Sequence, residues 1–146
     1  MQLDEFVRRS FGPSLARGYD VHMVRHRPSV LIVDDEPHLS RALAMGLRME
    51  GFETATAGSA KAALQKLAGR DFELAIVDLM MPETHGLELA RSIRLLYPSC
   101  RVVLTSAYHL TERQLVNADC GAIGFVPKPY DIEEVARFLR TKVEAG

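Results

Sequence analysis

The stretch that decides the fold of this 146-residue chain is VLIVDDEP, from Val30 to Pro37. Its first four residues are apolar and three of them are β-branched, which is typical of a short strand buried on both faces. Two carboxylates follow, and then comes a proline, a residue favoured in the first turn of a helix. The stretch therefore predicts a buried strand that ends at an acidic pair and leads into a helix.

The same strand-then-helix unit recurs along the rest of the chain. Further strands are predicted at Phe52–Ala57, Leu74–Val77, Arg101–Leu104 and Ala122–Val126. The segments after the strands have apolar residues at helical spacing: Pro37–Glu50, a segment capped by Ser59, Gly86–Tyr97, a segment from Thr111 to near Gly121, and one opened by Asp131. Strands and helices in strict alternation predict a parallel sheet with helices on both faces.

The overall composition narrows the class of protein. The chain is 47% hydrophobic and 25% charged, with a formal net charge of -1. This is typical of a globular domain and lacks the basic excess of a dedicated nucleic-acid binder. No apolar run reaches the roughly 18 residues that span a bilayer, and residues 1–10 lack the apolar region of a secretory signal. We therefore expect a cytoplasmic protein without direct nucleic-acid or membrane binding, in which Cys100 and Cys120 are small buried side chains.

Residues 1–28 do not show the alternation of strands and helices, and they are predicted to be an N-terminal extension to a domain spanning 29–146. An apolar set at helical spacing predicts one short helix stopped by Gly12 and Pro13; its members are Leu3, Phe6, Val7 and Phe11. Arg25 to Pro28 resembles a basic linker. Both a packed segment and a loosely attached tail remain open for this extension.

Polar side chains stand where the predicted strands end. The first strand ends in Asp34 and Asp35, the third in Asp78 and the fourth in Thr105, and Lys128 follows the fifth. In a doubly wound sheet the carboxyl ends of the strands line one crevice. Three carboxylates in one crevice repel each other unless a cation lies among them, and Mg²⁺ is the simplest hard ion with oxygen ligands. A carboxylate nucleophile, a metal, a lysine and a hydroxyl together indicate phosphoryl transfer.

Four motifs at these strand ends resemble the receiver domains of bacterial two-component response regulators. They are LIVDDEP (Leu31–Pro37), VDLMMP (Val77–Pro82), VLTS (Val103–Ser106) and GFVPKPY (Gly124–Tyr130). The resemblance covers about Ser29 to Glu144. It implies the flavodoxin-like receiver fold, an α/β doubly wound sheet of five parallel strands in the order 2-1-3-4-5 with helices on both faces.

The resemblance also implies how the acidic residues act. Asp78 is expected to be the phosphoacceptor, which takes a phosphoryl group from a sensor histidine kinase or a phosphotransfer protein. The expected Mg²⁺ ligands are Asp34, Asp35, Asp78 and the backbone carbonyl of Met80. The chain is then a signalling domain rather than an enzyme with a separate substrate.

Further residues are expected to respond to phosphorylation. Thr105 and Lys128 are expected to contact the phosphoryl oxygens, and Phe125 occupies the aromatic switch position. Lys128 and Pro129 are expected to be joined by a cis peptide bond, since such bonds are essentially confined to proline. The signal is expected to leave through the fourth helix, the fifth strand and the fifth helix, where the candidates are Leu110, Arg113, Leu115, Val116, Arg137 and Arg140.

Two departures from the family pattern bear on the chemistry. His85 stands where the family commonly has Asp, which predicts a changed cap for the third helix and places an imidazole near the site. Met80 and Ala107 stand beside the path of the hydrolytic water, and neither side chain can orient it. We therefore expect slow self-dephosphorylation.

The chain ends at Gly146, shortly after the last predicted helix. This favours a receiver that stands alone, as a monomer or a phosphorylation-dependent dimer, and acts on a downstream protein effector. One alternative is a docking scaffold in the receiver fold that works without phosphorylation. A second alternative is an aspartate-nucleophile hydrolase. Such enzymes usually have a second acid two residues after the nucleophile, and the residue at that position is Met80, which disfavours this alternative.

Overall fold

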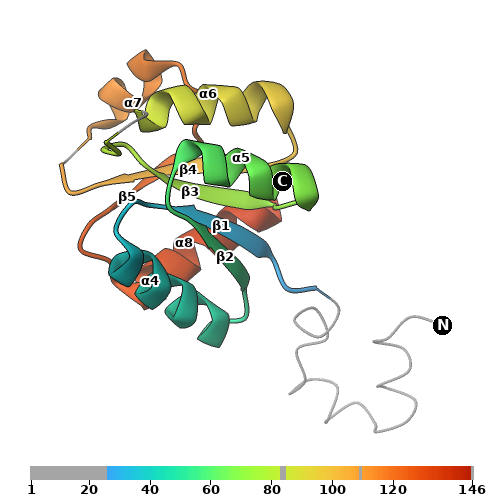
Figure 1. Cartoon of the computed structure of the whole chain (residues 1–146). Coiled ribbons are helices and arrows are strands. Elements are labelled where there is room, and N and C mark those ends of the chain that lie inside the picture. Colours follow the sequence, from blue (N-terminus) through green and yellow to red (C-terminus); the bar gives the residue numbers. More distant parts are fainter. Residues whose placement is uncertain (1–25, 83–84, 109, 146) are drawn as a thin grey trace, which may run out of the picture.

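The computed structural model describes residues 26–82, 85–108 and 110–145. Along these residues, strands and helices alternate from the first strand to the last helix (Figure 1). The strands are β1 (Ser29–Val33), β2 (Glu53–Ala57), β3 (Leu74–Asp78), β4 (Arg101–Ser106) and β5 (Gly124–Pro127). The helices are α4 (Pro37–Met49), α5 (Ala60–Gly69), α6 (Gly86–Leu96), α7 (Glu112–Ala118) and α8 (Ile132–Ala145).

All five strands form one parallel sheet in the order β2-β1-β3-β4-β5, which confirms the expected doubly wound topology. The chain runs from β1 out to β2 and then crosses back to β3 on the other side of β1. This reversal opens a crevice at the carboxyl ends of β1 and β3. In the register of the sheet, Asp78 at the end of β3 lies directly beside Thr105 of β4.

Helices cover both faces of the sheet (Figure 1). On one face, α5, α6 and α7 pack over a core that includes Leu31, Val77 and Leu104. On the other face, α4 and α8 pack over a second core. This core contains Ile32 and Ile76 of the strands and the buried side chains of the two helices. Because β1, β3 and most of β4 are buried on both faces, their sequences are continuous apolar runs rather than alternating ones.

The local signals for the helix ends are confirmed at two capping sites. The Ser59 hydroxyl accepts a hydrogen bond from the Ala62 N–H and so caps α5. Thr111 and Gln114 form the predicted capping box before α7, in which each side chain accepts from the other residue's backbone N–H. Two strands begin later than predicted: β2 begins at Glu53 rather than at Phe52, and β5 begins at Gly124 rather than at Ala122.

Both cysteines are free and buried, as the sequence predicts. Burial raises the pKa of the Cys100 thiol to about 12, so this side chain stays a neutral packing group at physiological pH. The helix expected over residues 3–11 lies outside the described residues. In the described part of the chain, no helix combines the length and the apolar content needed to cross a membrane.

Candidate functional site

Three carboxylates converge at the carboxyl end of β1 and β3. One oxygen from each of Asp34, Asp35 and Asp78 lies within 4.8 Å of the others. Asp34 and Asp78 are buried, whereas Asp35 is exposed, so the cluster opens to solvent on one side. We call these three residues the acidic pocket. An all-oxygen set that contains both buried and solvent-facing carboxylates fits Mg²⁺, which binds through a few carboxylates and retains several waters.

Backbone N–H groups orient the two buried carboxylates. Oδ1 of Asp34 accepts a hydrogen bond from the Glu36 N–H at 2.9 Å, and Oδ1 of Asp78 accepts one from the Met80 N–H at 3.0 Å. In both cases the aspartate bonds to the backbone two residues ahead, the local turn that this side chain favours. One oxygen of each carboxylate is therefore fixed by the chain, and its Oδ2 is left for other partners.

Lys128 reaches into the pocket from the loop after β5. Its Nζ lies 2.8 Å from Oδ2 of Asp34 and 3.0 Å from Oδ2 of Asp78. The contact with Asp78 is a hydrogen bond, and the shorter contact with Asp34 is an ion pair. Burial tends to lower the pKa of Lys128, but the two carboxylates together outweigh it and raise this pKa above its usual value. The lysine is therefore charged at neutral pH and offsets part of the negative charge.

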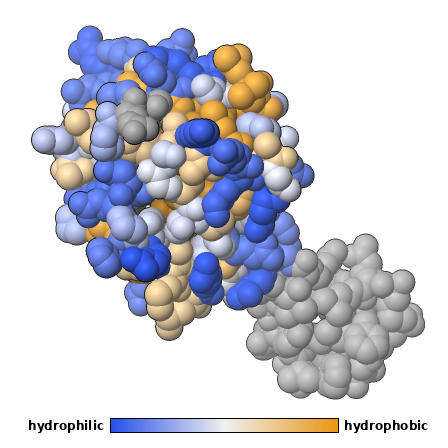
Figure 2. Space-filling model, in the orientation of Figure 1, coloured by the Kyte–Doolittle hydropathy of each residue, from blue (hydrophilic) through white to orange (hydrophobic). Residues whose placement is uncertain are grey.

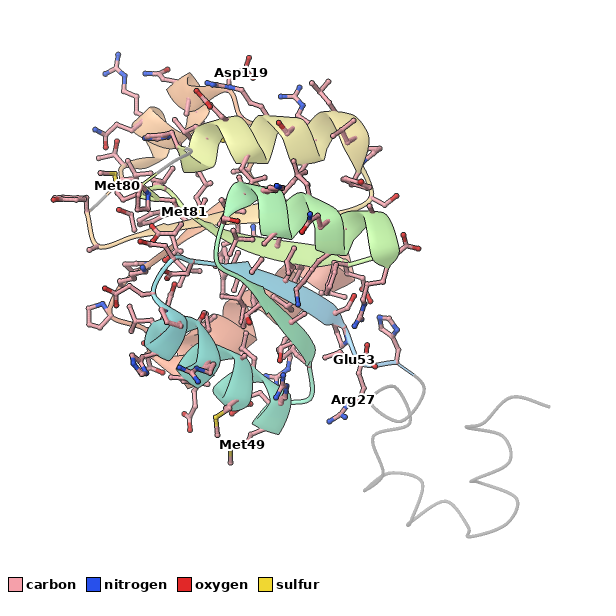
Figure 3. The ribbon with its side chains drawn as sticks, viewed as in Figure 1. Arg27, Met49, Glu53, Met80, Met81 and Asp119 are labelled. Atoms are coloured by element: carbon pink, nitrogen blue, oxygen red, sulfur yellow. The ribbon has the colours of Figure 1, made fainter. Side chains whose placement is uncertain are left out.

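The strands and the backbone hold these groups in register. The Leu79 N–H donates to the Thr105 carbonyl at 2.9 Å, and the Lys128 N–H donates to the Ser106 carbonyl at 3.0 Å. The peptide bond between Lys128 and Pro129 is cis. The sheet ladder thus continues one residue past the ends of β3 and β5, and it fixes the backbone next to Asp78 and at Lys128. Met80 and Met81 lie in the loop after β3, and the Met80 side chain is 56% exposed (Figure 3).

Two buried hydroxyl groups stand beside the acidic pocket without a well-formed hydrogen bond. They are Thr105 Oγ1 and the Tyr130 hydroxyl. Burial raises the pKa of Tyr130, and the neighbouring Thr105 side chain partly offsets that rise. An unsatisfied buried hydroxyl is costly, so Thr105 is ready to bond a group that arrives beside Asp78. Thr105 was expected at the site from the sequence, whereas no role was expected for Tyr130, the last residue of the motif GFVPKPY.

Phe125, the expected switch residue, lies one position before the β5 residue that pairs with Thr105. Its half-buried side chain packs against the core under α5, α6 and α7. Close by, a cavity of about 290 Å³ separates the loop after β4 from the start of α6 and is lined by Met80, Ser106, Tyr108 and Leu110 among others. The loop that follows Thr105 therefore has free space beside it.

The start of α6 contains two residues that matter for the position of Asp78. His85 is the N-cap: its Nδ1 accepts a hydrogen bond from the Leu87 N–H at 3.3 Å, the altered cap that the sequence indicates. Gly86 packs so closely that a Cβ there would lie 2.3 Å from the Asp78 carbonyl oxygen. Only glycine permits this approach, and sequence analysis missed it because one sequence does not reveal which glycines touch another segment.

One candidate of the expected output face also contacts another helix. The Arg140 guanidinium donates to the Glu50 carbonyl at 2.7 Å and pairs with its carboxylate at 3.0 Å. It also stands over the Phe52 ring, at 5.7 Å from the centroid. Arg140 therefore ties α8 to the end of α4, and its role on the output face stays a prediction. The pattern of α8 alone does not distinguish a helix face turned to solvent from one turned to a neighbouring helix.

The fold and the acidic pocket together define a class of protein. The model of the response regulator receiver domain matches residues 30–140, and the chain belongs to this family. Among curated relatives, the response regulator ArlR of Staphylococcus epidermidis is 33% identical over 112 residues, which are 77% of this chain and 51% of ArlR. The regulatory protein AtoC of Escherichia coli is 33% identical over 73% of this chain and 23% of its own length. The chain thus spans about half, or less, of the curated relatives that it matches.

Solved structures match along nearly their whole length. A CheY-like receiver domain protein from Methanospirillum hungatei superposes with a TM-score of 0.75 at 25% identity, over 82% of this chain and 96% of that one. TrrA of Thermotoga maritima, solved in complex with Mg²⁺ and BeF, gives a TM-score of 0.70 at 31% identity, over 78% and 97% of the two chains. Receiver domains are signalling domains, so the chain has a regulatory role in a two-component system.

Proposed function

We propose that this chain takes a phosphoryl group from a sensor histidine kinase or a phosphotransfer protein onto Asp78, in the cytoplasm. The observation that carries the proposal is the pairing of Asp78 Oδ2 with Lys128 Nζ at 3.0 Å, inside a cluster of three carboxylates. A buried carboxylate with one oxygen fixed by the backbone presents its other oxygen as a nucleophile. Residues 29–146 make up the receiver domain in this proposal, and residues 1–28 are an extension to it.

The reaction forms an acyl phosphate. Oδ2 of Asp78 attacks the phosphorus of a phosphohistidine, so that a P–O bond forms while the P–N bond breaks and the departing imidazole takes up a proton. Lys128 shifts from the carboxylates to the incoming phosphoryl oxygens, and the unsatisfied Thr105 hydroxyl donates a hydrogen bond to them. Asp34, Asp35 and Asp78, together with the Met80 carbonyl, would hold Mg²⁺, which would supply positive charge against the phosphoryl oxygens. The solved complex of the similar protein TrrA with Mg²⁺ and BeF supports Mg²⁺ as the metal.

Signalling follows from the movement of Thr105. As its hydroxyl turns to the phosphoryl group, the loop after β4 moves with it, and the cavity beside that loop provides the room. Phe125 then turns inward, and the face made by α7, β5 and α8 repacks, which changes how this face binds a downstream protein effector. The receiver acts as a monomer or as a phosphorylation-dependent dimer, and the only bonds it makes and breaks are those of its own acyl phosphate.

Intact mass spectrometry tests the proposal directly. The full chain is incubated with acetyl phosphate and Mg²⁺, beside the Asp78→Asn variant and a sample in which EDTA removes the metal. The proposal predicts the added mass of one phosphoryl group on the wild type with Mg²⁺, and little or none on the other two samples. An unmodified wild type would contradict the proposal and favour a scaffold that works without phosphorylation.

A further inference from the structure

An exposed apolar surface lies at the end of the fold where the strands begin, opposite the acidic pocket. It is formed at the C-terminal end of α6, where Leu95 is 80% exposed and Leu96 is 62% exposed. Figure 2 shows hydrophobic residues gathered on the surface over this end of α6. Two adjacent, largely exposed leucines are an unfavourable surface in water unless another segment covers them.

A hollow of about 210 Å³ adjoins this surface, between the C-terminal ends of α5 and α6. We call it the α6-end hollow. Its apolar lining consists of Leu67, Phe72, Leu96, Tyr97, Pro98 and Cys100. At its rim, the Arg70 guanidinium stacks over the Phe72 ring at 4.5 Å and pairs with Glu53 at 3.1 Å. The walls are therefore fixed by ordered contacts, and the hollow is a formed feature of the surface.

The N-terminal part of the chain joins the fold beside this hollow. His26 Nε2 lies 2.7 Å from a carboxylate oxygen of Glu73, the residue that directly follows Phe72. The Glu73 N–H also donates to the Ser29 carbonyl at 3.1 Å. The chain leading to residues 1–25 thus runs alongside the segment that lines the hollow.

The sequence of those residues fits such a surface. Leu3, Phe6, Val7 and Phe11 supply apolar side chains at helical spacing. Residues 12–25 separate them from His26 and can extend to roughly 45 Å, so reach does not limit contact with the α6-end hollow. Asp4, Glu5, Arg8 and Arg9 stand between and beside these apolar residues, and the rim of the hollow carries Arg70 and Asp71, so both surfaces present charges of both signs. A tether of this length gives an effective concentration on the order of millimolar, which favours docking within one molecule.

We propose that residues 3–11 dock in the α6-end hollow of the same molecule and cover Leu95 and Leu96. This assigns the N-terminal extension a binding site on the receiver that lies across the sheet from Asp78. The docking therefore does not require phosphorylation, and it leaves the acidic pocket and the face of α7, β5 and α8 free for other partners.

Site-specific photo-crosslinking tests the proposal with the full chain. Leu96 is replaced by benzoylphenylalanine, and equal amounts of ¹⁵N-labelled and unlabelled protein are mixed before irradiation. The proposal predicts crosslinks from position 96 to residues 3–11 that join peptides of the same isotopic label. Crosslinks that join labelled to unlabelled peptides would assign the hollow to a second copy, and the absence of crosslinks to residues 1–25 would also overturn the proposal.

Hydrogen exchange with variants gives a second measurement that does not need the crosslinker. In the full chain, Phe6→Asp is expected to raise the exchange rates of residues 3–11 by about tenfold, which corresponds to a segment docked about nine-tenths of the time, and to raise those of the peptide spanning 93–100 as well. Tyr19→Asp, a matched change outside the apolar set, is expected to leave both rates unchanged. Equal exchange rates of residues 3–11 in the wild type and in Phe6→Asp would overturn the proposal.

Discussion

Replacing Lys128 by methionine removes the positive charge from the acidic pocket and keeps much of the apolar stem. The side chains of Asp34 and Asp78 are 1% and 6% exposed, and both contact the lysine at 3.0 Å or less. Two unit charges 4.8 Å apart, the upper limit that the cluster sets, repel each other by about 3–4 kcal/mol at an effective dielectric constant of about 20. Leaving a buried charge unpaired costs about 3–5 kcal/mol, and water entering beside the exposed Asp35 relieves part of it. We therefore expect Lys128→Met to lower the free energy of unfolding by about 3 kcal/mol without metal.

Urea unfolding in EDTA and in Mg²⁺ measures this effect. Mg²⁺ is expected to restore most of the lost stability, because a divalent ion neutralises the same carboxylates. The variant should also bind Mg²⁺ more tightly than the wild type, since the lysine no longer competes for the two Oδ2 atoms. Lys66→Met, which changes an exposed lysine on α5, is the matched control and should stay within about 0.5 kcal/mol of the wild type. A Lys128→Met variant as stable as the wild type in EDTA would refute the charge balance argued here.

Three further predictions concern the surroundings of the pocket. Gly86→Ala should lower the free energy of unfolding by about 2 kcal/mol or more and slow phosphorylation, because the new Cβ would lie 2.3–2.9 Å from backbone atoms. Gly58→Ala is the control, since nothing lies within 4 Å of its new Cβ. In the same urea unfolding and phosphorylation assays, the control should change neither quantity. Thr105→Val should change the free energy of unfolding little, because the hydroxyl it removes makes no well-formed hydrogen bond, and yet slow phosphorylation by acetyl phosphate; a normal phosphorylation rate would remove Thr105 from the reaction. The acyl phosphate of the wild type should last minutes or longer in Mg²⁺. The acyl phosphate of Met80→Asn should be hydrolysed about tenfold faster, because the asparagine amide can orient the attacking water. Decay of the wild-type acyl phosphate within seconds would contradict this expectation.

The sheet was predictable because its strands are buried on both faces. Such strands appear as continuous apolar runs, and helix-like segments between them require parallel connections. The convergence of Asp34, Asp78 and Thr105 followed from the same reasoning, because parallel strands bring their carboxyl ends to one edge. The start of β5 was harder to predict, since Ala122 and Ile123 continue the apolar pattern before pairing with β4 begins at Gly124.

Contacts between segments distant in the sequence could not be predicted in this way. The close approach of Gly86 to the Asp78 carbonyl depends on how α6 leaves the loop after β3, and a glycine has no side chain to signal it. Arg140 looks like a surface residue in the sequence, but the packing of α8 against α4 turns it to Glu50. The unsatisfied hydroxyl of Tyr130 also depends on the placement of a loop rather than on the pattern of a strand.

The proposed function requires that Asp78 accepts the phosphoryl group and that Asp34 and Asp35 do not. Borohydride reduces an aspartyl phosphate to homoserine, so trapping followed by peptide mass spectrometry identifies the modified position. After reaction of the full chain with acetyl phosphate and Mg²⁺, we expect homoserine at position 78 and unmodified aspartate at positions 34 and 35. Homoserine at position 34 or 35, or at none of the three, would contradict the proposed function.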